Sequence, residues 1–311
     1  MNCIKILETG SYVPKEKVYN KELENILNLE DGYIEKRTGI KERYYAEDEE
    51  ITSMAIKAVE NLINNSNKKE KMQNIGLIIT ATTSSKNLMP GISNEIQKKF
   101  KLSNCICLDI LAGCSGFINA FDIAKIYIET GRVKAALVIG VDKLSEHTNK
   151  EDVGTSIILS DGAGAVLIGG INQSKKYYCN IEAKGENNKI LTCKADEKIK
   201  MNGKEIYKYA VTDTIENISQ LLEEANENMI NIKYIVPHQS NIKIMKAIAS
   251  RLKIDINKMY INIGTKGNTF CASIPIALDE MNKKALLEDK EKIILLGYGG
   301  GLNTGSIMIE I

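Results

Sequence analysis

The chain has 311 residues, of which 43% are hydrophobic and 26% charged, and 41 Lys and Arg against 40 Asp and Glu leave a net charge of +1. This composition is typical of a globular protein, and the balanced charge argues against binding to nucleic acid. Residues 1–8 resemble a strand more than a signal peptide, and no apolar run approaches the ~18 residues of a membrane helix, so we expect a cytoplasmic protein that does not bind membranes.

Predicted strands and helices alternate along the chain. Apolar, β-branched runs typical of strands buried on both faces occupy residues 75–80, 135–141 and 293–297, and another strand is predicted at 105–111. Residues 173–200 are polar and predict either an irregular excursion or short strands. Helical patterns cover residues 54–63, 92–100, 117–128, 211–226, 241–252 and 274–285. This alternation predicts an α/β fold with mostly parallel sheets covered by helices.

Two stretches repeat the same order of strand, glycine-rich turn, helix and strand. The first runs from a strand at 106–110 through Cys114, and the second runs from a strand at 259–263 through Asn268. We therefore expect two similar halves, residues 1–170 and 171–311. Cys114 and Asn268 then lie on equivalent turns at strand ends, where ligands bind in such sheets.

Cys114 is the strongest candidate for a catalytic residue. It lies between a predicted strand and a predicted helix, and its small neighbours allow a substrate to approach. The unpaired N–H groups of a helix start carry partial positive charge, which favours a thiolate. A cysteine in this position is suited to acyl transfer.

His238 and Asn268 are candidate partners of this cysteine. His238 follows a predicted strand that ends at Pro237, although a histidine there can equally brace the turn. Asn268 lies in a glycine-rich turn, where asparagine often has only a conformational role. Both residues follow strand ends, as Cys114 does, and together they offer a nucleophile and two hydrogen-bond donors.

The remaining cysteines and histidine suggest no metal site. The seven cysteines contain no Cys-x-x-Cys pair and there are two histidines, so we expect neither a bound metal nor a disulfide framework. His147 is expected to be a solvated residue of a polar loop. Cys105 and Cys107 alternate on a predicted strand and are expected to be buried as small hydrophobic residues.

Taken together, these motifs resemble those of the β-ketoacyl-[acyl-carrier-protein] synthase III family of thiolase-like condensing enzymes. The motifs that carry the resemblance cover nearly the whole chain: Arg37-Thr38-Gly39-Ile40 with Glu42-Arg43, Ala81-Thr82-Thr83-Ser84, Gly113-Cys114-Ser115-Gly116-Phe117, Asp161-Gly162-Ala163-Gly164-Ala165, Met201-Asn202-Gly203, Pro237-His238-Gln239-Ser240-Asn241, Gly267-Asn268-Thr269, Ala272-Ser273-Ile274-Pro275 and Gly299-Gly300-Gly301. The resemblance implies a thiolase-like fold of two similar halves in five layers, α-β-α-β-α. It also implies a homodimer, with Met89-Pro90 at the interface, and no permanently bound cofactor.

The resemblance implies a two-stage reaction. Cys114 takes an acyl group from a thioester, and the N–H groups of Cys114 and Gly300 form the oxyanion hole. A malonyl-type thioester then loses CO₂ while His238 and Asn268 stabilise the enolate, which attacks the acyl group. On this basis Cys114→Ala abolishes acyl transfer, whereas His238→Ala or Asn268→Ala spares acylation and blocks condensation. The product is a 3-oxoacyl thioester, formed in fatty-acid initiation or a specialised pathway.

The resemblance also implies where the substrates bind. The tryptophan and arginine that sandwich adenine in coenzyme A-dependent members are replaced by Tyr33 and Val153, so the donor is either acyl-coenzyme A or an acyl-carrier protein. The residues expected to bind the donor are Tyr33, Arg37, Lys204, Asn241 and Lys243. The acidic carrier protein is expected to dock on Lys208, Lys243 and Arg251, which otherwise form a solvated basic face.

Two other functions remain open at this point. One is an acyltransferase of the same fold that moves the acyl group to oxygen or nitrogen without condensation. The other, of a different class, is a non-catalytic subunit that binds a carrier protein or an acyl chain.

Overall fold

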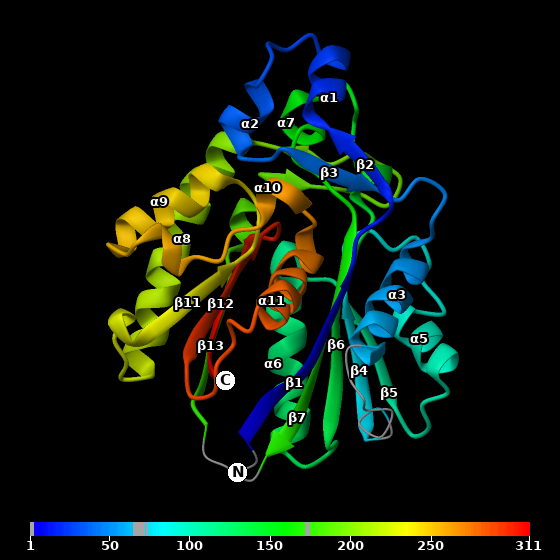
Figure 1. Ribbon diagram of the computed structural model, residues 1–311, viewed down its shortest axis with the longest axis vertical. Helices are drawn as coiled ribbons and strands as arrows, with labels where there is room; N and C mark the ends of the chain where they lie inside the picture. The colour runs from blue at the N-terminus through cyan, green and yellow to red at the C-terminus, as the bar shows by residue number, and fades with distance from the viewer. Residues whose placement is uncertain (1–2, 65–71, 73, 172–174) are drawn as a thin grey trace.

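The computed structural model describes residues 3–64, 72, 74–171 and 175–311, which form two sheets separated and covered by helices (Figure 1). The helices of these layers are α3 (Ile51–Asn64), α5 (Ile92–Phe100), α6 (Gly116–Glu129), α8 (Gly203–Glu224), α9 (Ile242–Leu252) and α11 (Ser273–Lys283). Helices α3 and α5 cover the outer face of the first sheet, and α8 and α9 pack together over the second. Helices α6 and α11 contact strands of both sheets and form the central layer. The expected five-layer α/β fold is therefore confirmed.

The first sheet contains strands from the N-terminal half of the chain. Among the described residues its order is β1-β7-β6-β4-β5. The strands are β1 (Cys3–Tyr12), β4 (Ile75–Ala81), β5 (Ile106–Ile110), β6 (Ala135–Asp142) and β7 (Gly162–Ile171). Strand β6 is buried at every position, because α3 covers one of its faces and α6 the other.

The second sheet contains strands from the C-terminal half. Within residues 175–311 its order is β11-β12-β13-β8, with β8 (Tyr177–Ala183), β11 (Ile232–Pro237), β12 (Lys292–Gly299) and β13 (Asn303–Glu310). Strand β8 is the longest ordered part of the excursion predicted at 173–200, of which residues 173 and 174 lie outside the described residues. The carboxyl ends of β5 and β11 carry Cys114 and His238.

Two expectations about the strands are wrong. The sheets are mixed rather than mostly parallel: β4 pairs in parallel with β5 and β6, and β11 with β12, but β1, β7, β13 and β8 form antiparallel pairs. The strand predicted at 259–263 is reduced to a bridge between Met259 and Ile235. The chain turns away because the N–H groups of Asn262 and Ile263 donate to the side-chain oxygen of Gln239, and a short helix begins at Ile263.

Short elements gather at one end of the two sheets, at the top of Figure 1. They are the antiparallel pair β2 (Glu16–Tyr19) and β3 (Glu42–Tyr45), the helices α1 (Asn20–Ile26), α2 (Tyr33–Thr38), α7 (Val153–Ser156) and α10 (Ile263–Lys266), and the pair β9 (Leu191–Thr192) and β10 (Lys200–Met201). One-turn 3-10 helices occupy Gly113–Ser115, Leu144–His147, Gly185–Asn187, Met229–Asn231, Ile256–Lys258 and Phe270–Ala272.

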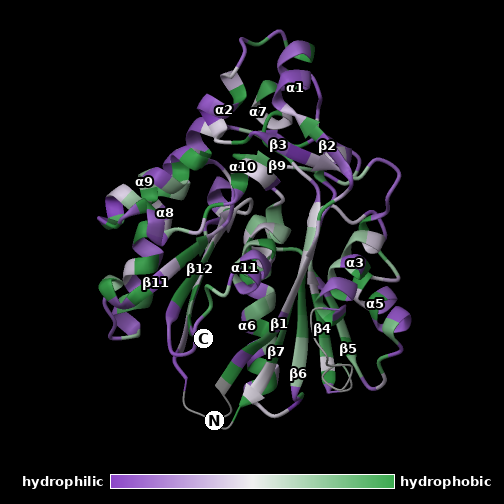
Figure 2. Ribbon diagram, in the orientation of Figure 1, coloured by the Kyte–Doolittle hydropathy of each residue, from purple (hydrophilic) through white to green (hydrophobic). Residues whose placement is uncertain are grey.

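Hydrophobic residues fill the spaces between the layers. Figure 2 shows hydrophobic colour along much of β4, β6 and β12, while α5 and α8 carry both colours, as expected for helices with one solvated face. One cluster of buried residues joins α6 and α11 to both sheets, and a second places Cys114 among the side chains of α8 and α9. Among the helices that the structure describes, none is long and apolar enough to cross a membrane.

Candidate active site

Cys114 lies at the start of α6, in the one-turn helix Gly113–Ser115, and is buried. Glycine is required at Gly113, beside the cysteine, and at Gly299, in the segment that packs against it. Gly113 has a φ of +60°, and a Cβ there lies 2.2 Å from the carbonyl oxygen of Gly300. A Cβ on Gly299 lies 2.7 Å from the Cys114 sulfur. Without side chains at these positions, the backbone of residues 299–300 can lie in direct contact with Cys114.

Asn303 holds these two turns together. Its side-chain amide donates to the carbonyl oxygens of Ala112 at 3.3 Å and Gly300 at 3.2 Å. The turn that precedes Cys114 and the turn that follows β12 are thus fixed to each other by one side chain.

The Cys114 thiol is neutral at rest, contrary to the thiolate that the helix start predicts. Burial raises the pKa of the thiol to about 12. The backbone N–H groups of Gly300 and of Cys114 lower that pKa, and the Asp142 carboxylate raises it. Desolvation thus outweighs the partial charge of the helix start, and the thiol must lose its proton to another group before it attacks.

His238 follows β11, and its ring is held from several sides. Its backbone N–H donates to Leu296 O at 2.7 Å, and its Nδ1 lies 2.8 Å from the hydroxyl of Ser273. The rings of Phe270 and Tyr298 meet it edge-on, with centroid distances of 6.4 and 5.4 Å. Burial lowers the pKa of His238 to about 3, so the imidazole is neutral at rest.

Asn268 is fixed by its backbone and by its side-chain oxygen. Its N–H donates to Ile158 O and its carbonyl accepts from Ser160 N–H, both at 2.9 Å. Its Oδ1 accepts the N–H of Phe270 at 3.1 Å. The Nδ2 group therefore remains as the donor that the side chain can offer to a ligand.

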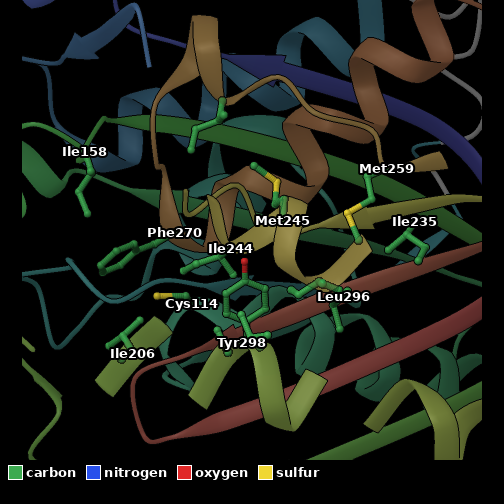
Figure 3. Packing of buried hydrophobic residues seen from close by; sticks show 14 of the residues in the cluster. Cys114, Ile158, Ile206, Ile235, Ile244, Met245, Met259, Phe270, Leu296 and Tyr298 are labelled. Carbon is green, nitrogen blue, oxygen red and sulfur yellow. The ribbon is translucent and has the colours of Figure 1, made fainter. Parts of the chain in front are cut away.

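Cys114, His238 and Asn268 line one cavity of about 140 Å³. Figure 3 shows Cys114 among Ile206, Ile244, Phe270 and Tyr298, with Ile158 on the far side of Phe270. Most of the exposed wall is apolar, and only a few polar groups face the cavity. A nucleophile and two polar side chains in a small apolar cavity are suited to acyl-transfer chemistry.

Of the residues expected to bind a donor, four meet at the cavity or beside it. Asn241 and Lys243 line the cavity, and Lys243 also lines a second hollow of about 490 Å³ that contains Tyr33 and Arg37. There the Arg37 guanidinium lies 4.7 Å from the centre of the Tyr33 ring. Lys204 is exposed at the start of α8, next to Gly203 of the cavity wall.

The expected docking residues lie on the two outer helices beside this opening. Lys208 is on α8, Lys243 and Arg251 are on α9, and all three are exposed. None of them forms an ion pair with a residue that the structure describes. Their charges are available to a partner.

His147, Cys105 and Cys107 differ from expectation. His147 is 6% exposed rather than solvated, because the loop at 193–199 covers it and Glu197 O lies 3.2 Å from its Nδ1. Cys105 and Cys107 are only half-buried. Within residues 3–64, 72, 74–171 and 175–311, no group of three His, Cys, Asp or Glu side chains is arranged to hold a metal ion.

The residue patterns did not reveal Asp142, which connects the turns around the site. Its buried carboxylate accepts the hydroxyls of Thr82, Thr83 and Ser84 and the N–H groups of Thr83 and Cys271. The position at the end of a buried strand was the only sequence signal. Asp142 thereby joins the ends of β4 and β6 to the turn that precedes α11.

Comparison with known proteins identifies relatives over the full length of the chain. The family models "3-Oxoacyl-[acyl-carrier-protein (ACP)] synthase III" and its C-terminal counterpart match residues 108–186 and 222–311. Beta-ketoacyl-[acyl-carrier-protein] synthase III of Clostridium acetobutylicum is 39% identical over 100% of this chain and 99% of its own length. The crystal structure of 3-oxoacyl-[acyl-carrier-protein] synthase III from Aquifex aeolicus has a TM-score of 0.95 at 36% identity, covering 99% of this chain and 100% of that one. The Thermus thermophilus synthase III structure has a TM-score of 0.93 at 30% identity, covering 98% of each chain.

Proposed function

The chain belongs to the 3-oxoacyl-[acyl-carrier-protein] synthase III family of thiolase-like condensing enzymes, and we propose that Cys114, His238 and Asn268 carry its chemistry. Membership confirms the expectation of a condensing acyltransferase of fatty-acid initiation and does not support the two alternatives. The observation that carries the assignment of residues is that all three side chains line one small cavity.

The first stage is transfer of an acyl group to Cys114. The sulfur attacks the carbonyl carbon of the donor thioester, and the carbonyl oxygen takes up negative charge. The N–H groups of Gly300 and Cys114 stabilise that oxygen as the oxyanion hole. The role is supported by the close packing of the 299–300 turn on Cys114 and by the effect of both N–H groups on the thiol pKa. The donor thiol departs and leaves an acyl-Cys114 intermediate.

The second stage is decarboxylative condensation. The thioester oxygen of a malonyl group accepts hydrogen bonds from His238 and Asn268, and loss of CO₂ leaves an enolate on that oxygen. Two fixed donors in a dry cavity are each worth about 3–4 kcal/mol toward this charge. The enolate carbon then attacks the acyl carbon, the bond to the Cys114 sulfur breaks, and a 3-oxoacyl thioester is released.

The donor enters beside Tyr33 and Arg37. We assign Tyr33, Arg37, Lys204, Asn241 and Lys243 to the binding of a coenzyme A thioester, which is a substrate rather than a permanently bound cofactor. Lys243 joins the outer hollow to the catalytic cavity, as a path for a pantetheine arm requires. Val153 packs against the core and supplies no cation for adenine, and Arg37 already covers one face of the Tyr33 ring. These contacts favour weak adenine binding and leave acyl-carrier protein as a second donor.

Acyl carrier protein docks on Lys208, Lys243 and Arg251. Carrier proteins are acidic, and these cations are exposed on α8 and α9 next to the cavity. Electrostatic attraction of this kind weakens as salt is added, because exposed charges are screened beyond about 10 Å at 0.1 M salt.

The chain acts as a homodimer that forms through β5. Strand β5 lies at the edge of the first sheet, and Leu88, Met89 and Leu111 near it are 92%, 84% and 79% exposed. An uncovered strand edge beside exposed apolar side chains is a site for association. We further assign the halves to residues 1–170 and 171–311 and place the enzyme in the cytoplasm.

Separate measurement of the two stages tests these roles. Cys114→Ala should gain no mass from an acyl donor, whereas Asn268→Ala should be acylated and fail to release CO₂ from a malonyl thioester. Acylation of Cys114→Ala contradicts the assignment of the nucleophile. Loss of acylation in Asn268→Ala as severe as in Cys114→Ala contradicts the division into two stages.

A further inference from the structure

Phe270 has a backbone conformation that is unusual for an aromatic residue. Its φ is +44°, in the left-handed region that glycine adopts at the least steric cost. Its N–H donates to Oδ1 of Asn268 at 3.1 Å, and its carbonyl oxygen accepts the hydroxyl of Ser273 at 2.8 Å. A glycine can form both of these backbone bonds. The aromatic side chain is therefore retained at an energetic cost, as is common for residues of functional sites.

The ring of Phe270 borders the groups that are assigned to the second stage. The side chain is 8% exposed and lines the catalytic cavity together with Cys114, His238 and Asn268. Its ring meets the His238 ring edge-on, at an interplanar angle of 75° and a centroid distance of 6.4 Å. A malonyl thioester whose oxygen binds His238 and Asn268 therefore has its C2 carbon, next to that carbonyl, beside the Phe270 ring.

The cavity has little room beyond what a malonyl group needs. Its volume is about 140 Å³. A cavity of about 150 Å³ holds one benzene molecule, which has six non-hydrogen atoms. A malonyl group also has six, three carbons and three oxygens, and the acyl group on Cys114 needs space as well. In a closely packed space of this size, one added methyl group matters.

We propose that Phe270 is a specificity-determining residue, whose ring occupies the space that a substituent on malonyl C2 requires. The inference rests on the enolate-stabilising roles of His238 and Asn268 proposed above. An unsubstituted malonyl thioester has only hydrogens on C2, whereas a 2-methylmalonyl thioester has a methyl group there. That methyl group remains after CO₂ leaves, so it must fit beside the ring while the carbon–carbon bond forms.

The ring is held in its place. Hydrogen bonds fix the backbone of Phe270 through both its N–H and its carbonyl oxygen. The side chain belongs to the buried cluster that contains Cys114 and side chains of α8 and α9. A misfit of one methyl group in a pocket changes a rate by about 10- to 200-fold. This is the discrimination that the ring is expected to provide.

The kinetic test compares malonyl and 2-methylmalonyl thioesters of acyl carrier protein as substrates of enzyme already acylated at Cys114. Product is measured by mass spectrometry. Wild type should favour malonyl by about 10- to 200-fold, and Phe270→Ala and Phe270→Gly should reduce this ratio to below about fivefold. Both rates are measured on one preparation, so the fraction of folded enzyme cancels from the ratio. No preference in wild type, or an unchanged ratio in both variants, overturns the proposal.

Ile206→Ala is the matched control. Ile206 lines the same cavity from α8 and is also 8% exposed, but it has no recorded contact with the His238 ring or with Asn268. The preference for malonyl should persist in Ile206→Ala. An equal loss of preference in Ile206→Ala and Phe270→Ala overturns the assignment to Phe270. Absence of acyl-Cys114 in wild type, or of product from the malonyl thioester, contradicts the proposed function instead.

Thermal melting tests the cost of the backbone conformation without any substrate. Phe270→Ala and Phe270→Gly both lose the ring, but only glycine adopts a φ of +44° without steric cost. Phe270→Gly should therefore melt at a higher temperature than Phe270→Ala. A lower melting temperature for Phe270→Gly overturns the argument that the ring is retained at a cost.

Discussion

The reactivity of Cys114 should depend on pH as that of a buried, neutral thiol. Its pKa is raised by burial from 9.0 to about 12. A difference of 3 pK units means about 1000-fold less thiolate near pH 8 than in an ordinary cysteine. Alkylation requires the thiolate, so Cys114 should react with iodoacetamide about 1000-fold more slowly than an exposed thiol of ordinary pKa.

The assay is alkylation with iodoacetamide between pH 7 and pH 10, without acyl donor, followed by peptide mass spectrometry. The rate at Cys114 should rise about tenfold per pH unit across the whole range, because its pKa lies above it. Cys193, which is exposed and whose pKa is raised less by burial, serves as the internal comparison on the same chain and should react faster throughout.

A rate at Cys114 that levels off below pH 9 refutes this reasoning. It shows that the N–H groups at the start of α6 lower the thiol pKa more than burial raises it. The cysteine is then already a thiolate before the donor binds.

Three other changes test the packing and charges around the site. Gly299→Ala should prevent acylation, measured by mass, and should lower stability in thermal melting by about 1–3 kcal/mol, because the new Cβ lies 2.6 Å from the Cβ of Cys114. The control Gly185→Ala, whose Cβ meets no atom within 4 Å, should change neither acylation nor stability. Asp142→Asn should lower the free energy of unfolding in urea by about 1–3 kcal/mol, because an amide cannot accept all the bonds of the buried carboxylate and leaves a buried donor unpaired. An unchanged free energy of unfolding contradicts this. Burial lowers the pKa of His238 from 6.5 to about 3, so the folded protein disfavours the charged imidazole, and up to about 5 kcal/mol of stability is lost as pH falls from 6.5 to 3. In His238→Leu the free energy of unfolding in urea should fall less steeply over this pH range, and an unchanged slope contradicts the reasoning.

The sequence predicted best those elements whose pattern reports burial directly. The helix predicted at 92–100 is α5, and the strand predicted at 75–80 is β4 with one more residue. Strand direction was not predictable, because a strand buried on both faces is apolar whether its neighbours are parallel or antiparallel. Helix α8 begins at Gly203, eight residues before the predicted start, since Asn202 caps it and its polar first turns conceal the period.

For the active site, the sequence indicated the reacting groups but not their supports. Cys114, His238 and Asn268 each follow a strand end, and that position is visible in a pattern. Ser273 reaches His238 across 35 residues, and Asp142 reaches Cys271 across 129, so these contacts exist only in the folded chain. The same holds for the thiol pKa, because the helix start is visible in the sequence and the burial that outweighs it is not.

The most direct test of the account is intact-protein mass spectrometry after incubation with acyl-coenzyme A and acyl-carrier-protein thioesters, with Cys114→Ala as the control. The account predicts a gain of one acyl mass in the wild type and none in the control, followed by loss of that mass when a malonyl thioester is added. Gain from coenzyme A thioesters indicates that Tyr33, Arg37 and the lysines suffice to bind the donor, and gain from carrier-protein thioesters alone indicates that the altered adenine site excludes coenzyme A. An equal gain in the control, or an acyl group that a malonyl thioester does not remove, contradicts the account.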